Sequence, residues 1–442
     1  MRRSPYFVIT FCVLLLAGLD AQAQCPPLNA LYPLDAAGWD AMRPQIERRM
    51  PDCLSSAEYF ALLGAARLNG GDLPGALEAL ERALLIDPSH GAAQLDYAEA
   101  LHQSGQLFAA LELNRGLLER RDLPANLQPM LRARQELWNR ERRRFSLLGE
   151  LAAGYDSNLN GAPASSEVVL TLSGESVTLT LNPDFQPQEG AYANTRVVAS
   201  YSVLSNEDRQ DLLLSLRSRA SADHASDLTQ LDWRYGYTRD FYPGWTSRLG
   251  WEVTGGTSHL LYGGSPLYSV LDLRNRLLLR REIGCSPLFE IAAQYQRYHG
   301  QSIISGVESS LGGGWLCQSA TGRSTLELQA GYLRNDGTDA SRPGGDRQGW
   351  RLQAHWQYQL GQGALDFDAI YARLDDQLGY SPLLNNGAAR DIDNYQLRLQ
   401  YQYPFTARAR FFTRLNYQNQ NSNLVPFRND GTAFELGLRY QF

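Results

Sequence analysis

The histidines, acids and hydroxyls of this sequence have no spacing that indicates catalysis. The six histidines are His90, His102, His224, His259, His299 and His355. None is spaced as zinc ligands are, and no GxSxG nucleophile elbow occurs. His299 and His355 could each pair with a serine, but a lone histidine on a strand is usually passive. We therefore expect no enzyme, no cofactor and no metal.

One stretch concentrates side-chain oxygens: Tyr155-Asp156-Ser157-Asn158-Leu159-Asn160. A calcium site needs several oxygen ligands, usually with more than one carboxylate. This stretch supplies the single carboxylate of Asp156. The sequence therefore favours a polar turn at the end of a strand over a calcium site.

The N-terminus has the pattern of a secretory signal. Arg2 and Arg3 precede the apolar run Phe7 to Leu16, and Ala21-Gln22-Ala23 is a small-x-small cleavage site. Residues 1–23 are therefore interpreted as a signal peptide. Gln24 stands where a lipid-modified Cys25 would require a small residue, so ordinary cleavage is favoured.

Export places the remaining cysteines in an oxidising compartment. Cys25, Cys53, Cys285 and Cys317 allow three connectivities. The domain organisation below favours local pairing, Cys25 with Cys53 and Cys285 with Cys317. The formal net charge of -6 gives no indication of nucleic-acid binding.

Residues 24–144 have a helical pattern and a 34-residue repeat. Small and apolar residues fall on the spacing of a tetratricopeptide repeat, namely Phe60, Leu63, Gly64, Gly71, Ala76, Leu80, Ala83 and Pro88. We expect two repeats, Ser55 to Asp87 and Pro88 to Leu123, although Arg67 and Asn114 are atypical. Cap helices are expected at Asp35 to Met50 and Ala125 to Arg144. Such arrays bind peptides or proteins on a concave face, which indicates a periplasmic docking domain.

Residues 145–442 alternate with period two, and the last strand shows this best. Phe434, Leu436, Leu438, Tyr440 and Phe442 share one face, while the other face carries Glu435 and Arg439. Lipid on one side and water on the other indicate a closed transmembrane barrel. A terminal Phe after alternating apolar residues also resembles the sorting signal of bacterial outer-membrane barrels.

About fourteen strands are expected in this barrel, and long and short connections alternate between them. The expected strands are 145–155, 191–204, 208–222, 227–240, 244–257, 266–281, 286–299, 305–318, 323–335, 347–360, 363–375, 390–404, 406–420 and 432–442. Ser205-Asn206-Glu207 and Tyr242-Pro243 are short. Asp156 to Gly190, Gly255 to Pro266, Gly300 to Gly306, Asn335 to Asp346, Asp376 to Arg390 and Asn419 to Gly431 are longer. The short turns are expected in the periplasm and the long loops outside.

A hydrated lumen of mixed charge follows from the same alternation. The expected lumen-facing residues are Glu150, Arg217, Arg219, Asp272, Arg274, Arg276, Glu327, Arg351, Asp366, Asp368, Arg398, Arg410, Arg414 and Arg439. This set is compatible equally with a structural network of ion pairs and with a translocation path.

A signal, tetratricopeptide repeats and a barrel of about fourteen strands together resemble the surface lipoprotein assembly modulator (Slam) family. Gly154-Tyr155-Asp156-Ser157-Asn158-Leu159-Asn160 looks like a recurrent feature of that family's barrel. The resemblance implies an outer-membrane translocator that delivers lipoproteins, or secreted proteins such as haemophores. It implies outer-membrane lipids and a protein cargo as partners. Whether the barrel works alone or together with the barrel-assembly machinery is left open by the sequence.

Two other functions fit the same organisation. Exopolysaccharide export porins also join tetratricopeptide repeats to a barrel, and a passive porin with a periplasmic scaffold is the third option. A lumen that conducts a glycan should carry rows of aromatic side chains. The aromatic residues here mostly share the apolar faces of the strands, which favours protein cargo.

Overall fold

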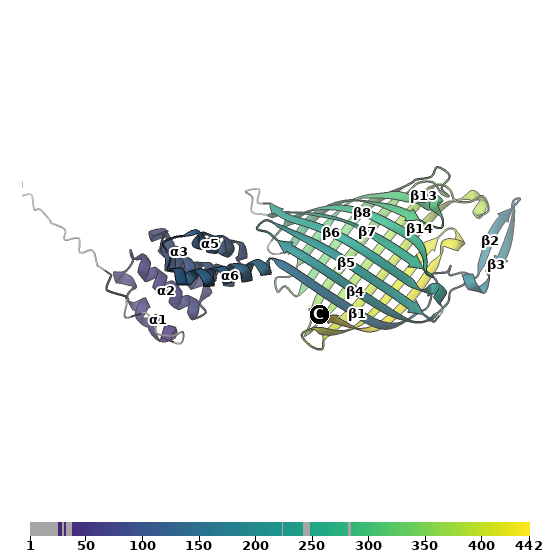
Figure 1. The fold of residues 1–442 in the computed structure, drawn as a ribbon. Helices are drawn as coiled ribbons and strands as arrows, with labels where there is room; N and C mark the ends of the chain where they lie inside the picture. Colours follow the sequence, from purple (N-terminus) through teal and green to yellow (C-terminus); the bar gives the residue numbers. More distant parts are fainter. Residues whose placement is uncertain (1–24, 29–30, 32–37, 223, 242–247, 282–283) are drawn as a thin grey trace, which may run out of the picture. The chain divides into compact units, whose positions relative to one another are not determined.

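The computed structural model describes residues 25–28, 31, 38–222, 224–241, 248–281 and 284–442. The expected signal peptide and the expected turn at Tyr242-Pro243 lie outside these residues. The chain divides between Arg140 and Glu141 into a helical unit and a barrel unit (Figure 1). None of the described helices is long and apolar enough to span a membrane.

The helical unit is built from antiparallel pairs. Its helices are α1 (Gly38–Arg48), α2 (Ala57–Asn69), α3 (Leu73–Ile86), α4 (Gly91–Gln103), α5 (Leu107–Glu119) and α6 (Gln128–Glu141). The side chains of Ser56 and Asp72 cap α2 and α3 by accepting backbone N–H bonds. The pairs α2–α3 and α4–α5 confirm the two expected repeats.

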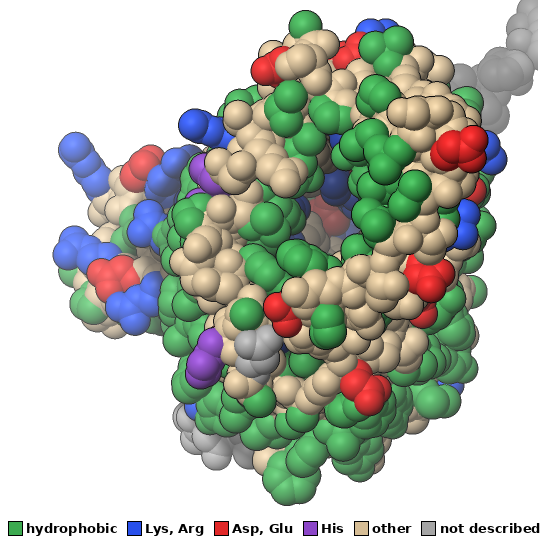
Figure 2. All heavy atoms as spheres, turned by 90° about the vertical axis from the view of Figure 1, so that its right-hand side faces the viewer, with side chains coloured by type: hydrophobic (Ala, Val, Ile, Leu, Met, Phe, Trp, Pro, Cys, Tyr) green, Lys and Arg blue, Asp and Glu red, His purple; other side chains and the backbone are tan. Residues whose placement is uncertain are grey.

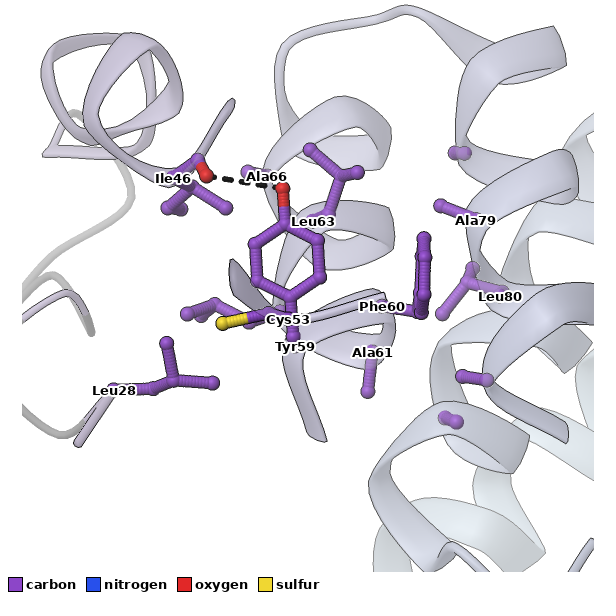
Figure 3. Packing of buried hydrophobic residues seen from close by; sticks show 14 of the residues in the cluster. Leu28, Ile46, Cys53, Tyr59, Phe60, Ala61, Leu63, Ala66, Ala79 and Leu80 are labelled. Atoms are coloured by element: carbon purple, nitrogen blue, oxygen red, sulfur yellow. Dashed lines mark hydrogen bonds between the residues drawn. The ribbon is translucent and has the colours of Figure 1, made fainter. Parts of the chain in front are cut away.

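Close packing between α2 and α3 explains the small residue in the first repeat. A Cβ at Gly64 would lie 2.4 Å from Leu80 Cγ, so only glycine lets the helices approach this closely. The N-terminal segment packs on the other side of α2. There the buried Tyr59 donates its hydroxyl to Ile46 O over 3.0 Å (Figure 3), and the Cys25–Cys53 disulfide holds the segment in place.

The second cap helix is shorter than expected. It was predicted to run to Arg144, but α6 ends at Glu141 and strand β1 starts at Arg143. The reason is pairing with β4: Leu204 N donates to Arg142 O over 2.8 Å, and Arg143 is in register with Val203. Sheet hydrogen bonds replace the last helical turn.

The barrel unit is a closed antiparallel barrel of fourteen strands, as predicted. Its strands are β1 (Arg143–Asp156), β4 (Gly190–Leu204), β5 (Asp208–Ser221), β6 (Leu228–Phe241), β7 (Arg248–Tyr262), β8 (Ser265–Arg280), β9 (Gly284–Tyr298), β10 (Gly306–Gln318), β11 (Ser324–Gly337), β12 (Arg347–Leu360), β13 (Gly363–Gly379), β14 (Ala389–Pro404), β15 (Ala409–Ser422) and β16 (Asn429–Gln441). Each pairs with its neighbour in sequence, and β1 pairs with both β4 and β16. The connection after β1 contains the separate hairpin of β2 (Glu167–Leu172) and β3 (Glu175–Thr180).

The prediction of a loop from Gly255 to Pro266 is wrong. Strand β7 continues to Tyr262, and Gly263-Gly264 turns the chain directly into β8. Both glycines have positive φ, 54° and 77°, which suits a tight hairpin turn between twisted strands. The strands around Asp376 to Arg390 and Asn419 to Gly431 are also longer than expected, because β13 runs to Gly379 and β15 to Ser422.

The barrel wall separates two kinds of surface. Large apolar side chains face outward and are widely exposed, for example Leu151 (62%), Phe289 (65%) and Trp350 (59%). Viewed from the end that carries β2 and β3, the barrel is hollowed, and charged side chains lie inside (Figure 2). An apolar outside and a charged inside are the reverse of a soluble barrel.

Candidate functional site in the barrel lumen

The strand registers place every residue of the expected lumen set on the inner face. Glu150 of β1 is in register with Arg439 of β16 and with Arg196 of β4. Arg414 of β15 is in register with Glu435. Inward residues of neighbouring strands are therefore close enough to interact around the whole wall.

A buried ion-pair network lies on the wall formed by β14, β15, β16 and β1. Arg414 donates from Nη1 to Glu435 Oε2 (2.6 Å) and from Nη2 to Glu150 Oε1 (3.0 Å). Arg439 Nη2 donates to the other oxygen of Glu150 over 2.8 Å. Glu435 is 1% exposed and Glu150 is 4% exposed. Such deep carboxylates are tolerated only when their charge is paired and hydrogen-bonded.

Neutral side chains complete this network. Tyr192 Oη and Asn194 Nδ2 each donate to Glu435 Oε1 over 2.9 Å. Gln400 Oε1 accepts from Arg414 Nε over 2.9 Å. The ring of Phe412 lies 4.8 Å from the Arg414 guanidinium, which fixes the arginine against the wall.

The residues of the family-like stretch turn inward at the end of β1. Asn158 is almost fully buried, donates to Ala162 O and Asp430 O, and accepts from Ala162 N. Asn160 donates to Gln186 O over 2.8 Å and accepts from Gln188 N. Gly154 packs beneath Tyr192, since a Cβ there would lie 2.6 Å from the tyrosine ring. Residues 157–161, which we call the inward loop, thus form a fixed polar turn.

The inward loop also makes hydrogen bonds to β16 and β5. Ser157 exchanges hydrogen bonds with the backbone of Thr432, and Arg219 donates to Leu159 O over 2.8 Å. Asp156 forms an ion pair with the same Arg219. Tyr155, by contrast, is 49% exposed on the outer face.

A cavity of about 570 Å³ lies beside the inward loop. Asn160, Arg217, Tyr262, Gln396, Arg398 and Gln418 are among its lining residues. Charged and amide groups dominate the lining, so the cavity suits a hydrated polar ligand better than an apolar one.

Of the two histidines considered for serine pairing, only His299 makes such a bond. Its Nε2 lies 2.8 Å from Ser269 Oγ, and His259 Nδ1 approaches the same hydroxyl at 2.8 Å. Neither ring makes a hydrogen bond to a carboxylate within the described parts of the chain, so no triad is assembled. His355 instead contacts Asp368 in the lumen. The described residues include no cluster of three or more metal-ligating side chains.

Both expected disulfides form. Cys25 is bonded to Cys53, and Cys285 is bonded to Cys317. Cys285 of β9 and Cys317 of β10 are directly paired in the sheet. They lie at the same end of the barrel as the short turn at residues 205–207. The expected sorting-signal side chains all lie on the outer face and are between 37% and 69% exposed: Phe434, Leu436, Leu438, Tyr440 and Phe442.

The two atypical repeat residues have structural roles in the helical unit. Arg67 donates to Gly75 O over 3.1 Å and so joins α2 to α3. Asn114 is fully buried and donates to Leu131 O and Gln135 Oε1, joining α5 to α6. Each polar side chain replaces an apolar contact with hydrogen bonds between neighbouring helices.

One acidic side chain of the helical unit is electrostatically unusual. Burial raises the pKa of Asp96 on α4 to about 6, and the nearby Glu99 carboxylate adds to this rise. Arg134 on α6 opposes it, but Arg134 also pairs with Glu99 at 3.3 Å. The pKa of Asp96, about 6, therefore lies well above the usual range of an aspartate.

The network partners of Glu435 were not identified from the sequence. Tyr192 and Asn194 are neutral, and nothing in their local pattern marks them as partners of a charge. Only the closure of β1 on both β4 and β16 brings them together. A useful signal would have been that these residues occupy inward-facing strand positions at the same height in the barrel as Glu150.

A comparison with family models matches residues 68–134 to the tetratricopeptide repeat. A comparison with curated proteins finds no match. Among solved structures, the helical part is similar to PcrH in complex with the chaperone binding region of PopD. That similarity has 23% identity and a TM-score of 0.22, and it covers 24% of this chain and 82% of the other.

The barrel part is similar to solved outer-membrane proteins. The outer membrane channel DcaP of Acinetobacter baumannii is 10% identical with a TM-score of 0.40, covering 68% of this chain and 98% of its own. A Pseudomonas aeruginosa FadL homologue is 11% identical with a TM-score of 0.37, and the similarity covers 68% of this chain and 90% of the homologue.

Proposed function

We propose that this chain is an outer-membrane translocator that delivers surface lipoproteins, or related secreted proteins such as haemophores, to the cell exterior. The observation that carries the proposal is the covalent order of the two units. Helix α6 ends at Glu141 and β1 begins at Arg143, so the repeats lead into the barrel without a linker. A protein-binding array is thus attached to the entry strand of a barrel with an apolar exterior.

The topology supports a periplasmic helical unit. The chain enters β1 at the end where Ser205-Asn206-Glu207 makes a short turn, whereas the long connection with β2 and β3 leaves the opposite end. Short turns face the periplasm in outer-membrane barrels. The two disulfides agree with folding in an oxidising compartment.

The alternative is a polysaccharide export porin. A polymer path would present stacked aromatic rings to the lumen, but the large aromatic residues of the strands mostly face outward. The inward Tyr192 and Phe412 are engaged with Glu435 and Arg414. This arrangement favours protein cargo over glycan.

A co-expression assay tests the proposal. Each exported protein encoded beside this chain would be produced in a heterologous Gram-negative host with and without it, and intact cells and medium would be probed by antibody. We expect one candidate to reach the surface or the medium only with this chain. A version lacking residues 24–140 serves as the control for cargo docking. If every candidate stays inside while the barrel is inserted, the proposal fails and glycan export gains support.

A further inference from the structure

Basic and acidic side chains are distributed unequally over the inner wall of the barrel. On β15, β16, β1, β4 and β5 the inward charges are mostly basic. The basic residues are Arg144, Arg196, Arg209, Arg217, Arg219, Arg410, Arg414 and Arg439, against the acidic Glu150, Asp156, Asp211 and Glu435. On β6 to β11 the inward charges are more often acidic. The acidic residues are Asp232, Asp240, Glu252, Asp272, Glu290, Glu308 and Glu327, against the basic Arg234, Arg248, Arg274, Arg276 and Arg280. A basic wall and an acidic wall therefore share one lumen.

The basic wall contains like charges in direct register. Arg196 is opposite Arg217 across β4 and β5, and Arg410 is opposite Arg439 across β15 and β16. Directly opposed side chains of like charge destabilise a sheet. Glu150 stands between the two pairs, but its oxygens already accept from Arg414 and Arg439.

Arg217 is left without a protein anion. It is exposed to the lumen and makes no hydrogen bond or ion pair with any residue that the structure describes, and the same is true of partly buried Arg196. The carboxylates that line the cavity beside Arg217 are engaged elsewhere. Asp156 pairs with Arg219, Asp368 with Arg398, and Glu435 with Arg414.

We propose that this cavity binds an oxyanion-bearing polar ligand, with Arg217 as the contact. Arg196 does not line the cavity, but its register with Arg217 adds positive charge beside the site. A guanidinium offers two parallel N–H donors to a phosphate or a carboxylate. The cavity is also lined by the amide side chains of Gln396, Asn416 and Gln418. None of these amides hydrogen-bonds to a residue that the structure describes, so they can donate to the rest of the ligand. The anion would relieve the repulsion between Arg196 and Arg217.

The site is independent of the cargo proposed above. A single oxyanion chemistry, phosphate or carboxylate, is inferred from the guanidinium pair. The two proposals are tested separately, because the surface-display assay reports protein delivery and does not measure ligand binding.

Calorimetric titration of the full chain in detergent with sodium tripolyphosphate tests the site, with citrate in a parallel titration. We expect saturable binding that weakens at least tenfold in Arg217→Gln and also weakens in Arg196→Gln. Binding of citrate with the same dependence would support a general oxyanion site, and binding of tripolyphosphate alone would narrow it to phosphate.

Arg234→Gln is the matched control. Arg234 is also an exposed, inward arginine without a described partner, but it lies on β6 beside Asp232 in the acidic wall. Its replacement should leave binding unchanged. Equal weakening in Arg234→Gln, or no binding by the unaltered chain, would overturn the proposal. Arg217→Lys, which keeps the charge, distinguishes a lost contact from a misfolded barrel.

Discussion

Arg414 and Glu435 face each other across β15 and β16 on the inner face of the barrel, with 2.6 Å between Nη1 and Oε2. Removing one member of a buried pair leaves the other charge unpaired, which costs about 3 kcal/mol or more. Glu435→Gln should therefore lower the free energy of unfolding of the barrel by about that amount. Thermal unfolding in detergent, followed by gel mobility of unheated samples, measures it.

The control for this substitution is Asp375→Asn. Asp375 pairs with Arg373, but both side chains are about half exposed. Exposed pairs contribute about 0–1 kcal/mol. An equal loss of stability in both variants would contradict the special role of the buried network.

Asn158→Ala should release the inward loop. The substitution removes the bonds to Ala162 and Asp430 that hold the turn inside the lumen. We expect a larger and noisier single-channel conductance in planar bilayers, because the loop occupies less of the lumen on average. Asn182→Ala, in the same connection but exposed, should conduct like the unaltered chain. Unchanged conductance in Asn158→Ala would show that the loop does not restrict the lumen.

Asp96 should make the helical unit sensitive to pH. The pKa of Asp96 in the folded chain, about 6, exceeds that of an unfolded aspartate, about 3.9. The folded state therefore binds the proton more tightly, and this stabilising contribution is present below about pH 4 and lost as pH rises to about 6.

Asp96→Asn should raise helical stability above pH 6 by about 3 kcal/mol, because the two pKa values differ by about two units, and it should remove this pH dependence. The loss of circular dichroism at helical wavelengths, measured on the full chain between pH 4 and pH 8, reports it. Glu112→Gln, on the exposed face of α5, should not change the profile. A profile for Asp96→Asn that matches the unaltered chain would count against the assigned titration.

Phe442→Ala should reduce assembly of the barrel into the outer membrane severalfold. Phe442 is 69% exposed, and its backbone N–H donates to Leu147 O over 3.0 Å. The substitution keeps this bond and removes only the ring, which we expect to be part of a sorting signal. Phe411→Ala, an exposed outer residue of neighbouring β15, is the control. Equal membrane levels for the two variants would refute a signalling role for Phe442.

Most of the barrel could be predicted because period-two alternation is a local property of the chain. The inward placement of Arg398 and Arg414 follows from alternation alone. The strand limits near Gly255 could not be predicted, since glycines that sit inside β7 look like loop residues in sequence. In the structure Gly256 packs directly against the backbone of β6, where a Cβ would lie 2.6 Å from Trp233 O.

The candidate site was only partly predictable. The pattern indicates which charges face inward, but not which of them pair. Arg217 and Arg219 are equivalent by pattern, yet Arg219 meets Asp156 and Arg217 meets no described carboxylate. That difference depends on the register between β4 and β5 and on the path of the inward loop, which are set by the closed fold.

The seam between β1 and β16 has a kinetic consequence. It pairs Leu148 with Gln441, residues from opposite ends of the barrel sequence. Contacts of such high contact order form slowly, because the ends of a long chain must first meet. Until they do, both β1 and β16 present unpaired edges that can add foreign strands. The interval before ring closure is therefore when this barrel most needs a chaperone or an insertion machine to shield its edges.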